Sequence, residues 1–401
     1  GFMLASLSLI FIVGLAMGAI CQKLKLPRII GMLVTGIVLG PYVLDLLDPS
    51  ILSISAELRK MALIIILLKA GLSLDLKDLK KAGRSAVLLS FVPASFEIVG
   101  YVLCAPAILG ITRVEAAVMG AVLGAVSPAV VIPRMVTLME KKYGTEKAIP
   151  QMVMAGASCD DIFVIVLFTT FLSIAQGGHA NVRDFVNIPV SIVLGIILGA
   201  VTGYGLYLFF ETAYARKHCV RNSIKVIIVL GFSFLLVSVE GWLEGKISLS
   251  GLLAVVAMAC VIKMKSPVFV SKRLSEKFGK LWLAAEVMLF VLVGAAVDIR
   301  YTLSAGLSAV LMIFVALLFR SVGVLLCVAG TRLTWKERLF CVIAYLPKAT
   351  VQAAIGSVPL AAGLACGKIV LSVAVLAIII TAPLGAIGMD AAYQRLLEKE
   401  N

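Results

Sequence analysis

The sequence predicts an all-α protein that crosses the membrane many times, and three observations lead to this prediction. Of its 401 residues, 61% are hydrophobic and only 14% are charged, whereas a soluble domain carries about 25% charged residues. The apolar runs are continuous and do not alternate, which favours helices over the strands of a membrane β-barrel. The chain also has 34 Gly and 13 Pro, and transmembrane helices tolerate both better than soluble helices do.

A membrane-spanning helix needs about 20 mostly apolar residues, within a range of about 17–25. By this measure we predict thirteen spans joined by short loops, with no stretch long enough for a soluble domain. The first range lacks the charged start and the cleavage site of a signal peptide, so it is interpreted as a span. The predicted ranges are 1–20, 28–47, 58–74, 84–109, 115–138, 147–175, 187–210, 222–240, 248–263, 280–298, 303–330, 337–361 and 368–388.

Basic residues alternate between the loops that join these spans. The odd-numbered loops hold 23 Lys and Arg, and the even-numbered loops hold 7. Cytoplasmic loops carry the excess of Lys and Arg, so we predict an N-terminus outside and a C-terminus in the cytoplasm. One missed or invented span would destroy the alternation, which therefore supports the count. The same rule explains the formal net charge of +14, and we expect no nucleic-acid partner.

Eight charged residues remain at membrane depth or near the ends of spans. Each costs roughly 2.5–3.5 kcal/mol at the centre of an inserted helix, which adds up to a burden on the order of 20 kcal/mol unless the charges pair or face water. They therefore need a structural or functional reason. The eight are Lys69, Arg134, Arg320, Lys348, Glu97, Asp160, Asp161 and Glu286.

Asp160 and Asp161 lie in the sixth predicted span, about 21 Å along the helix from Lys147 at 1.5 Å per residue. Adjacent helical residues point about 100° apart, so one carboxylate can face a cavity while the other meets a neighbouring helix. Na⁺ and Li⁺, as hard cations, prefer oxygen ligands. A water-poor site disfavours a bare carboxylate charge, so such a group can exchange a proton for a cation. The alternative is that both acids are held in static salt bridges.

Glu97 and Arg320 are isolated charges inside the fourth and eleventh spans. An unpaired buried charge is strongly destabilising, so we predict an ion pair between them with a mainly structural role. Arginine stays protonated in proteins, so Arg320 cannot carry a transported proton. In the twelfth span, Pro347 removes a backbone donor and the polar residues Lys348, Thr350 and Gln352 follow, which indicates a broken helix that lines a cavity.

A second break is predicted at Ser127 and Pro128 in the fifth span. Each broken span follows a span with a single buried charge, which suggests two copies of one unit. The second broken span comes seven spans after the first, and because this number is odd the two copies run through the membrane in opposite directions. The pattern indicates an inverted-topology repeat, whose interrupted spans point to an ion site at the membrane midplane. We expect the breaks to cross beside the aspartates, with Ser127 completing the cation shell and Lys348 offsetting the negative helix ends.

These residues resemble the cation:proton antiporter superfamily, the NhaA/NapA-type sodium/proton exchangers, over nearly the whole chain. The likeness is greatest to the animal sodium/hydrogen exchanger 9B group. It is carried by the run Gly124-Ala-Val-Ser-Pro-Ala-Val-Val131, the Asp160-Asp161 pair and the run Leu346-Pro-Lys-Ala-Thr-Val-Gln-Ala-Ala-Ile-Gly-Ser357.

The resemblance implies an NhaA/NapA-like fold, a homodimer and a six-helix transport core that moves like an elevator. It gives Asp161 the role of ion ligand and Asp160 that of its partner or proton carrier, with Na⁺ held at Asp161 and Asp160 and no cofactor. The implied domains are a dimerisation domain of 1–83 and 222–302, a transport core of 84–176 and 303–388, a linker helix of 187–210 and a cytoplasmic tail of 389–401.

Two positions depart from relatives of this kind. Many bacterial members carry an acid in the first broken helix, where this chain has Ser127 and Pro128. Electrogenic relatives carry a lysine that pairs with the first aspartate, where this chain has Arg320. A stoichiometry of two protons per sodium ion therefore does not carry over, and our hypothesis is electroneutral exchange of one proton per cation.

Na⁺(Li⁺)/H⁺ antiport is thus the predicted function, with K⁺/H⁺ antiport as a close variant and a bacterial inner membrane as the expected location. A sodium-coupled organic-anion symporter of the same fold also uses crossing broken helices, but it does not need tandem carboxylates in mid-span. An intramembrane aspartyl protease needs two aspartates on different helices facing one water. Asp160 and Asp161 are adjacent, which disfavours this enzyme.

Overall fold

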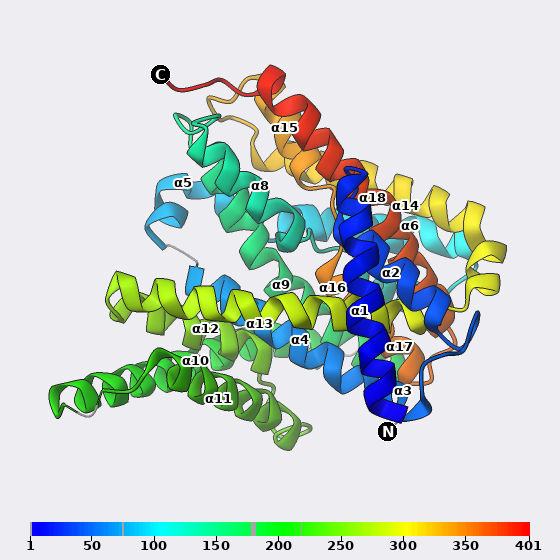
Figure 1. The fold of residues 1–401 in the computed structure, drawn as a ribbon. Coiled ribbons are helices and arrows are strands. Elements are labelled where there is room, and N and C mark those ends of the chain that lie inside the picture. The colour runs from blue at the N-terminus through cyan, green and yellow to red at the C-terminus, as the bar shows by residue number, and fades with distance from the viewer. Residues whose placement is uncertain (1, 74–75, 178–181, 218) are drawn as a thin grey trace. The chain divides into compact units, whose positions relative to one another are not determined.

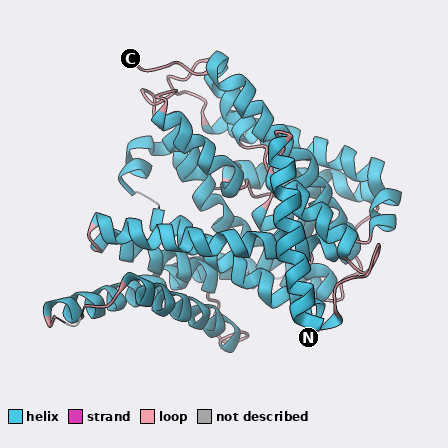
Figure 2. Ribbon diagram, in the orientation of Figure 1, coloured by secondary structure: helices cyan, strands magenta, loops and turns pink. Residues whose placement is uncertain are grey.

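The computed structural model describes residues 2–73, 76–177, 182–217 and 219–401. Within these ranges every regular element is a helix, and only a single isolated pairing, Tyr143 with Lys399, has a strand-like geometry (Figure 2). Nine helical segments in the described residues are long and apolar enough to cross a membrane. The all-helical, multi-pass character predicted from the sequence is therefore confirmed.

The helices of Figure 1 are numbered in chain order, and their bounds are as follows. They are α1 (Phe2–Lys23), α2 (Arg28–Leu39), α3 (Pro49–Ser53), α4 (Ser55–Ser73), α5 (Leu76–Leu89), α6 (Val92–Leu109), α7 (Arg113–Leu123), α8 (Pro128–Glu140), α9 (Ile149–Gly177), α10 (Val182–Ala215), α11 (Asn222–Trp242), α12 (Gly251–Lys265), α13 (Val268–Ala295), α14 (Ile299–Cys327), α15 (Trp335–Ala344), α16 (Thr350–Ile355), α17 (Val358–Ala361) and α18 (Gly367–Leu396).

The second predicted span was too long. Its helix, α2, ends at Leu39 because Gly40 is extended, with φ −73° and ψ 175°, and Pro41 follows. A proline disfavours the helical conformation in the residue before it. The apolar residues from Val43 to Leu47 that suggested a longer helix lie in a turn and a connection before α3.

The chain divides into two compact units. One holds residues 60–75 and 179–286, and in it α10 packs on α12, which in turn packs on α11. Large apolar side chains such as Leu68, Met258 and Phe278 are fully buried in its core. The other unit holds residues 1–59, 76–178 and 287–401, and it contains every site residue predicted from the sequence.

In the second of these units, α6 and α14 lie side by side and bring Glu97 and Arg320 together (Figure 1). The short helices α7 and α15 begin with the same device. Thr112 accepts from the Glu115 amide and Thr334 accepts from the Glu337 amide, while each glutamate accepts from its own threonine's amide. Such capping boxes satisfy amides that would otherwise be unpaired at a helix start. Both broken helices therefore begin at fixed points.

Candidate functional site

The two predicted breaks are present, and they contact each other. Helix α7 ends at Leu123 and α8 begins at Pro128, while α15 ends at Ala344 and α16 begins at Thr350. The Ser127 amide donates a hydrogen bond to the Pro347 carbonyl oxygen at 2.8 Å, so the two interruptions are joined through their backbones. Pro128 occupies the first turn of α8, where a missing N–H costs nothing.

The end of α7 points its free carbonyl groups at cationic and amide side chains. Lys348 Nζ donates to the Leu123 carbonyl, Arg320 Nη1 donates to the Gly124 carbonyl at 2.5 Å, and Gln352 Nε2 donates to the Ala125 carbonyl at 3.0 Å. A helix carries partial negative charge at its C-terminus, which these donors offset. Lys348 therefore lies at a helix end, where the sequence analysis expected it to offset negative charge.

Glu97 lies between two cations in the same cluster. Its Oε2 atom is 2.8 Å from Arg320 Nη1 and 2.7 Å from Lys348 Nζ. All three side chains are fully buried. The predicted Glu97–Arg320 ion pair is therefore present, and Lys348 joins it, which the sequence reasoning did not foresee. Arg320 of α14 also donates through Nε to the Tyr345 carbonyl at 2.5 Å. It therefore contacts Glu97 of α6, the first break at Gly124 and the second break at Tyr345.

Asp160 and Asp161 are both buried on α9, but their surroundings differ. Asp160 Oδ2 accepts a hydrogen bond from the Val126 amide at 2.8 Å and lies 3.8 Å from Arg320 Nη2. No cationic side chain of the described residues lies within 4 Å of Asp161, and its Oδ1 has no hydrogen-bond partner there. The alternative that static salt bridges hold both acids therefore does not apply to Asp161.

Several neutral oxygens of the crossing are also buried without a hydrogen-bond partner in the described structure. They are Ser127 Oγ at the start of α8, Thr350 Oγ1 at the start of α16 and Gln352 Oε1 two residues further on. Hydroxyl, amide and carboxylate oxygens are the ligand atoms that hard cations take. The crossing thus offers buried oxygen ligands, and Asp161 of α9 adds a buried carboxylate that has no cationic partner among the described residues.

The formal charges of this cluster do not cancel when every group is ionised. Glu97, Asp160 and Asp161 carry three negative charges, and Arg320 and Lys348 carry two positive charges. A buried net charge is costly in surroundings of low dielectric constant. One proton or one monovalent cation restores neutrality, so the arrangement can hold either of them.

Sequence reasoning missed two features that support the site. Lys348 N–H donates to Thr381 Oγ1 at 3.0 Å, which fixes the second break against α18. The only sequence signal for this contact was one threonine in a mostly apolar span, which is common and therefore weak.

The second missed feature is the pair of Thr-x-x-Glu capping boxes at the starts of α7 and α15. The interval from Thr112 to Pro128 equals that from Thr334 to Thr350.

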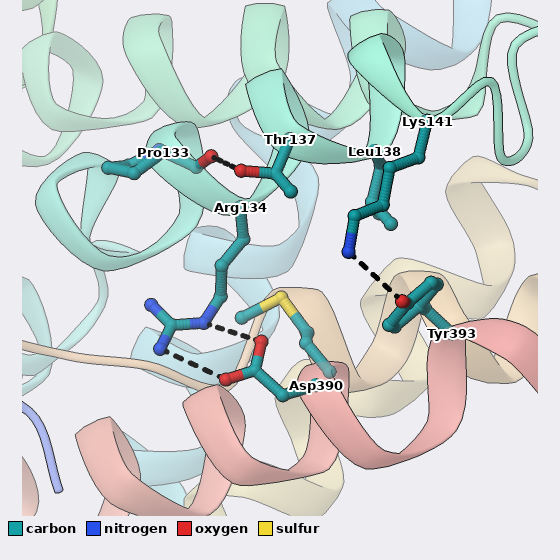
Figure 3. A pocket seen from close by; sticks show the side chains of 8 residues that line it. Pro133, Arg134, Thr137, Leu138, Lys141, Asp390 and Tyr393 are labelled. Carbon is teal, nitrogen blue, oxygen red and sulfur yellow. Dashed lines mark hydrogen bonds and ion pairs between the residues drawn. The ribbon is translucent and has the colours of Figure 1, made fainter. Parts of the chain in front are cut away.

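A surface cavity of about 400 Å³ lies between α8 and α18, and its lining contains none of the predicted site residues (Figure 3). Within it, Arg134 Nε and Nη2 donate to the two carboxylate oxygens of Asp390 at 3.1 and 3.3 Å. Lys141, the residue that follows α8, donates to the Tyr393 hydroxyl at 3.4 Å. The cavity has basic side chains on its walls and does not touch the buried carboxylates.

The Arg134–Asp390 pair should contribute little to stability. The two side chains are 30% and 62% exposed, and exposed pairs typically contribute about 0.2–1 kcal/mol. We expect Asp390→Asn to lower the free energy of unfolding by about 1 kcal/mol or less and to leave transport unchanged. Thermal melting of the purified variant and its initial transport rate test this, and a twofold loss of rate would contradict it.

Comparison with known proteins places this geometry in a family. The family description "Sodium/hydrogen exchanger, transmembrane" matches residues 7–390. The chain belongs to the sodium/hydrogen exchanger family. Sodium/hydrogen exchanger 9B2 of Homo sapiens is 36% identical over 390 residues, which cover 93% of this chain and 70% of the relative. Sodium/hydrogen exchanger 9B1 of Homo sapiens is 32% identical over 419 residues, covering 99% and 78%.

A solved structure has the same fold as this exchanger-family chain. The sodium proton antiporter MjNhaP1 from Methanocaldococcus jannaschii matches with a TM-score of 0.85 and 20% identity, over 98% of each chain. The resemblance to cation:proton antiporters predicted from the sequence is therefore confirmed. Members of this family are transporters and not enzymes, so the aspartyl protease alternative is excluded.

Proposed function

We propose that this protein exchanges Na⁺ or Li⁺ for H⁺ across its membrane, with Asp161 as the group that holds either ion. Membership of the sodium/hydrogen exchanger family supports cation/proton antiport. The observation that carries the assignment is the buried Asp161 carboxylate, which has no cationic partner among the described residues and lies next to a carboxylate that has one.

The exchange follows from the charge of the cluster. A proton on Asp161 leaves the five buried charged groups neutral in sum, and so does a monovalent cation bound at Asp161 with help from Asp160 and the Ser127 hydroxyl. The empty, ionised state carries one uncompensated negative charge, which burial disfavours. The ion site therefore changes its access from one side of the membrane to the other only when it holds a proton or a cation. One proton is then exchanged for one cation, and no net charge moves across the membrane.

Glu97, Arg320 and Lys348 have a structural role in this proposal. Arg320 and Lys348 offset the carbonyl end of α7, and their ion pairs with Glu97 hold α6, α7 and the second break together. Neither cation is needed as a proton carrier. The residues Pro128, Pro347 and Thr350 lie at the two helix breaks. The breaks place helix ends beside the ion, and the dipoles of these ends contribute to its binding.

The architecture of the family supports the wider proposal. We propose thirteen spans in two inverted repeats, an elevator movement of a core formed by 84–176 and 303–388, a linker helix at 187–210 and a homodimer formed through 1–83 and 222–302. The matched capping boxes of α7 and α15 support the repeat. The distribution of Lys and Arg supports an outside N-terminus and a cytoplasmic C-terminus.

Transport by purified protein in proteoliposomes tests the proposal. A pH-sensitive dye reports proton movement on addition of Li⁺, Na⁺ or K⁺, while K⁺ and valinomycin impose a membrane potential in separate Na⁺ and Li⁺ assays. We expect Na⁺ and Li⁺ to drive proton flux at rates that do not depend on the potential. A larger response to K⁺ would favour K⁺/H⁺ antiport, a rate that follows the potential would overturn the one-for-one stoichiometry, and cation uptake without proton flux would favour symport.

A further inference from the structure

Three buried polar groups beside Asp160 lack a hydrogen-bond partner in the described structure. They are Asp160 Oδ1, Arg320 Nη2 and the Tyr345 hydroxyl. Unpaired buried polar atoms are rare, because each forfeits the hydrogen bonds it makes in water. Three such atoms in one small region have the donors and acceptors to pair with one another.

Tyr345 is placed to reach Asp160. It is fully buried at the end of α15, and its ring lies 5.6 Å from the guanidinium carbon of Arg320. Its hydroxyl lies directly over Gly156 of α9, where a Cβ atom would collide with it. Asp160 is one turn further along the same face of α9, since residues four apart are neighbours on a helix.

The direction of helical side chains brings the two groups nearer. Side chains on a helix lean toward its N-terminus and cover the preceding turn, so the Asp160 carboxylate leans toward Gly156 and the Tyr345 hydroxyl above it. Asp160 Oδ2 is already held by the Val126 amide, which leaves Oδ1 as the acceptor. The absence of a side chain at Gly156 leaves the space that the hydroxyl occupies.

We propose that Tyr345 is a positioning residue for Asp160: its hydroxyl donates to Asp160 Oδ1 when the site binds its cation, and Gly156 is the glycine that makes room for it. With both oxygens held, the carboxylate cannot rotate. Oδ1 keeps a second lone pair for the cation, so the hydrogen bond orients the ligand without occupying it. This inference rests on the proposed exchange of Na⁺ for H⁺.

Removing only the hydroxyl tests the proposal. Tyr345→Phe keeps the ring against Arg320 and the carbonyl that Arg320 binds. In proteoliposomes, we expect the apparent KM for Na⁺ to rise about 3- to 10-fold, which is the effect of losing one hydrogen bond, while the maximal rate stays within twofold. Tyr393→Phe is the matched control, because it also removes one tyrosine hydroxyl but does so at the surface cavity between α8 and α18. Its KM should stay within twofold of the native value.

A second variant reaches the same interaction from the other side. Gly156→Ala keeps Tyr345 but places a methyl group against its hydroxyl and also against Leu89 Cβ. In protein that elutes as native in size-exclusion chromatography, it should raise the KM for Na⁺ in the same direction. An unchanged KM in either variant, or a fall in maximal rate with native KM, overturns the proposal. These outcomes are separate from a failure of the proposed function, which the native protein would reveal by showing no cation-driven proton flux.

Discussion

Asp161→Asn should abolish cation-driven proton flux. The asparagine has nearly the same shape but carries no charge and binds no proton, so the proton and the cation no longer compete for one carboxylate. We expect the initial rate in proteoliposomes to fall at least 100-fold, to the level of protein-free vesicles. A twofold loss at most would show that Asp161 is not the exchanging group.

The protein itself supplies a matched control for this substitution. Asp390→Asn makes the same chemical change at an acid that is 62% exposed and paired with Arg134, away from the buried cluster. Its transport should equal that of the native protein. Asp161→Asn should also remain folded, because it removes a buried charge that has no cationic partner among the described residues. A native elution profile in size-exclusion chromatography separates a lost site from a lost fold.

Glu97→Gln should destabilise the protein more than any other single substitution in the cluster. Its carboxylate faces both Arg320 and Lys348, so the amide leaves Lys348 without a carboxylate within 4 Å among the described residues and leaves Arg320 only Asp160, at 3.8 Å. Removing one partner of a buried ion pair costs about 3–5 kcal/mol. We expect a lower melting temperature in detergent and a reduced yield of monodisperse protein.

Lys348→Gln is the comparison that tests this explanation. Glu97 keeps Arg320 at 2.8 Å in that variant, and the amide can still donate to a carbonyl at the end of α7. Its loss of stability should therefore be smaller than that of Glu97→Gln. If the two variants melt at the same temperature, the cluster does not behave as one carboxylate shared by two cations.

The sequence predicted those parts of the site that follow from the free-energy cost of placing a charged or helix-breaking residue inside an apolar span. A charge inside an apolar span is expensive, so Glu97 and Arg320 had to pair, and the ion pair is present. The breaks predicted at Pro128 and Pro347, where a polar residue adjoins the proline, are both present, whereas Pro106, Pro133, Pro189 and Pro383 lie inside helices. These predictions need only the position of a residue along its span.

The other features of the site depend on which neighbours a side chain meets in three dimensions, and the position of a residue along its span does not show this. Lys348 lies in a stretch without helical periodicity, so the sequence could place it near helix ends but not beside Glu97. Nothing in the sequence distinguishes Tyr345 from the other aromatic residues of the spans. Only the structure shows that its hydroxyl lies against Gly156. Helix α2 was predicted too long because apolar composition alone does not show where Gly40 and Pro41 end it.

The hydrogen bond from the Ser127 amide to the Pro347 carbonyl has a consequence for mutagenesis. Both atoms belong to the main chain, so replacing either residue by alanine leaves the donor and the acceptor in place. An alanine scan would therefore report these positions by their side chains alone and would miss the link between the two interrupted helices. Replacing the amide of residue 127 with an ester by chemical synthesis removes that donor and would reveal what the link contributes.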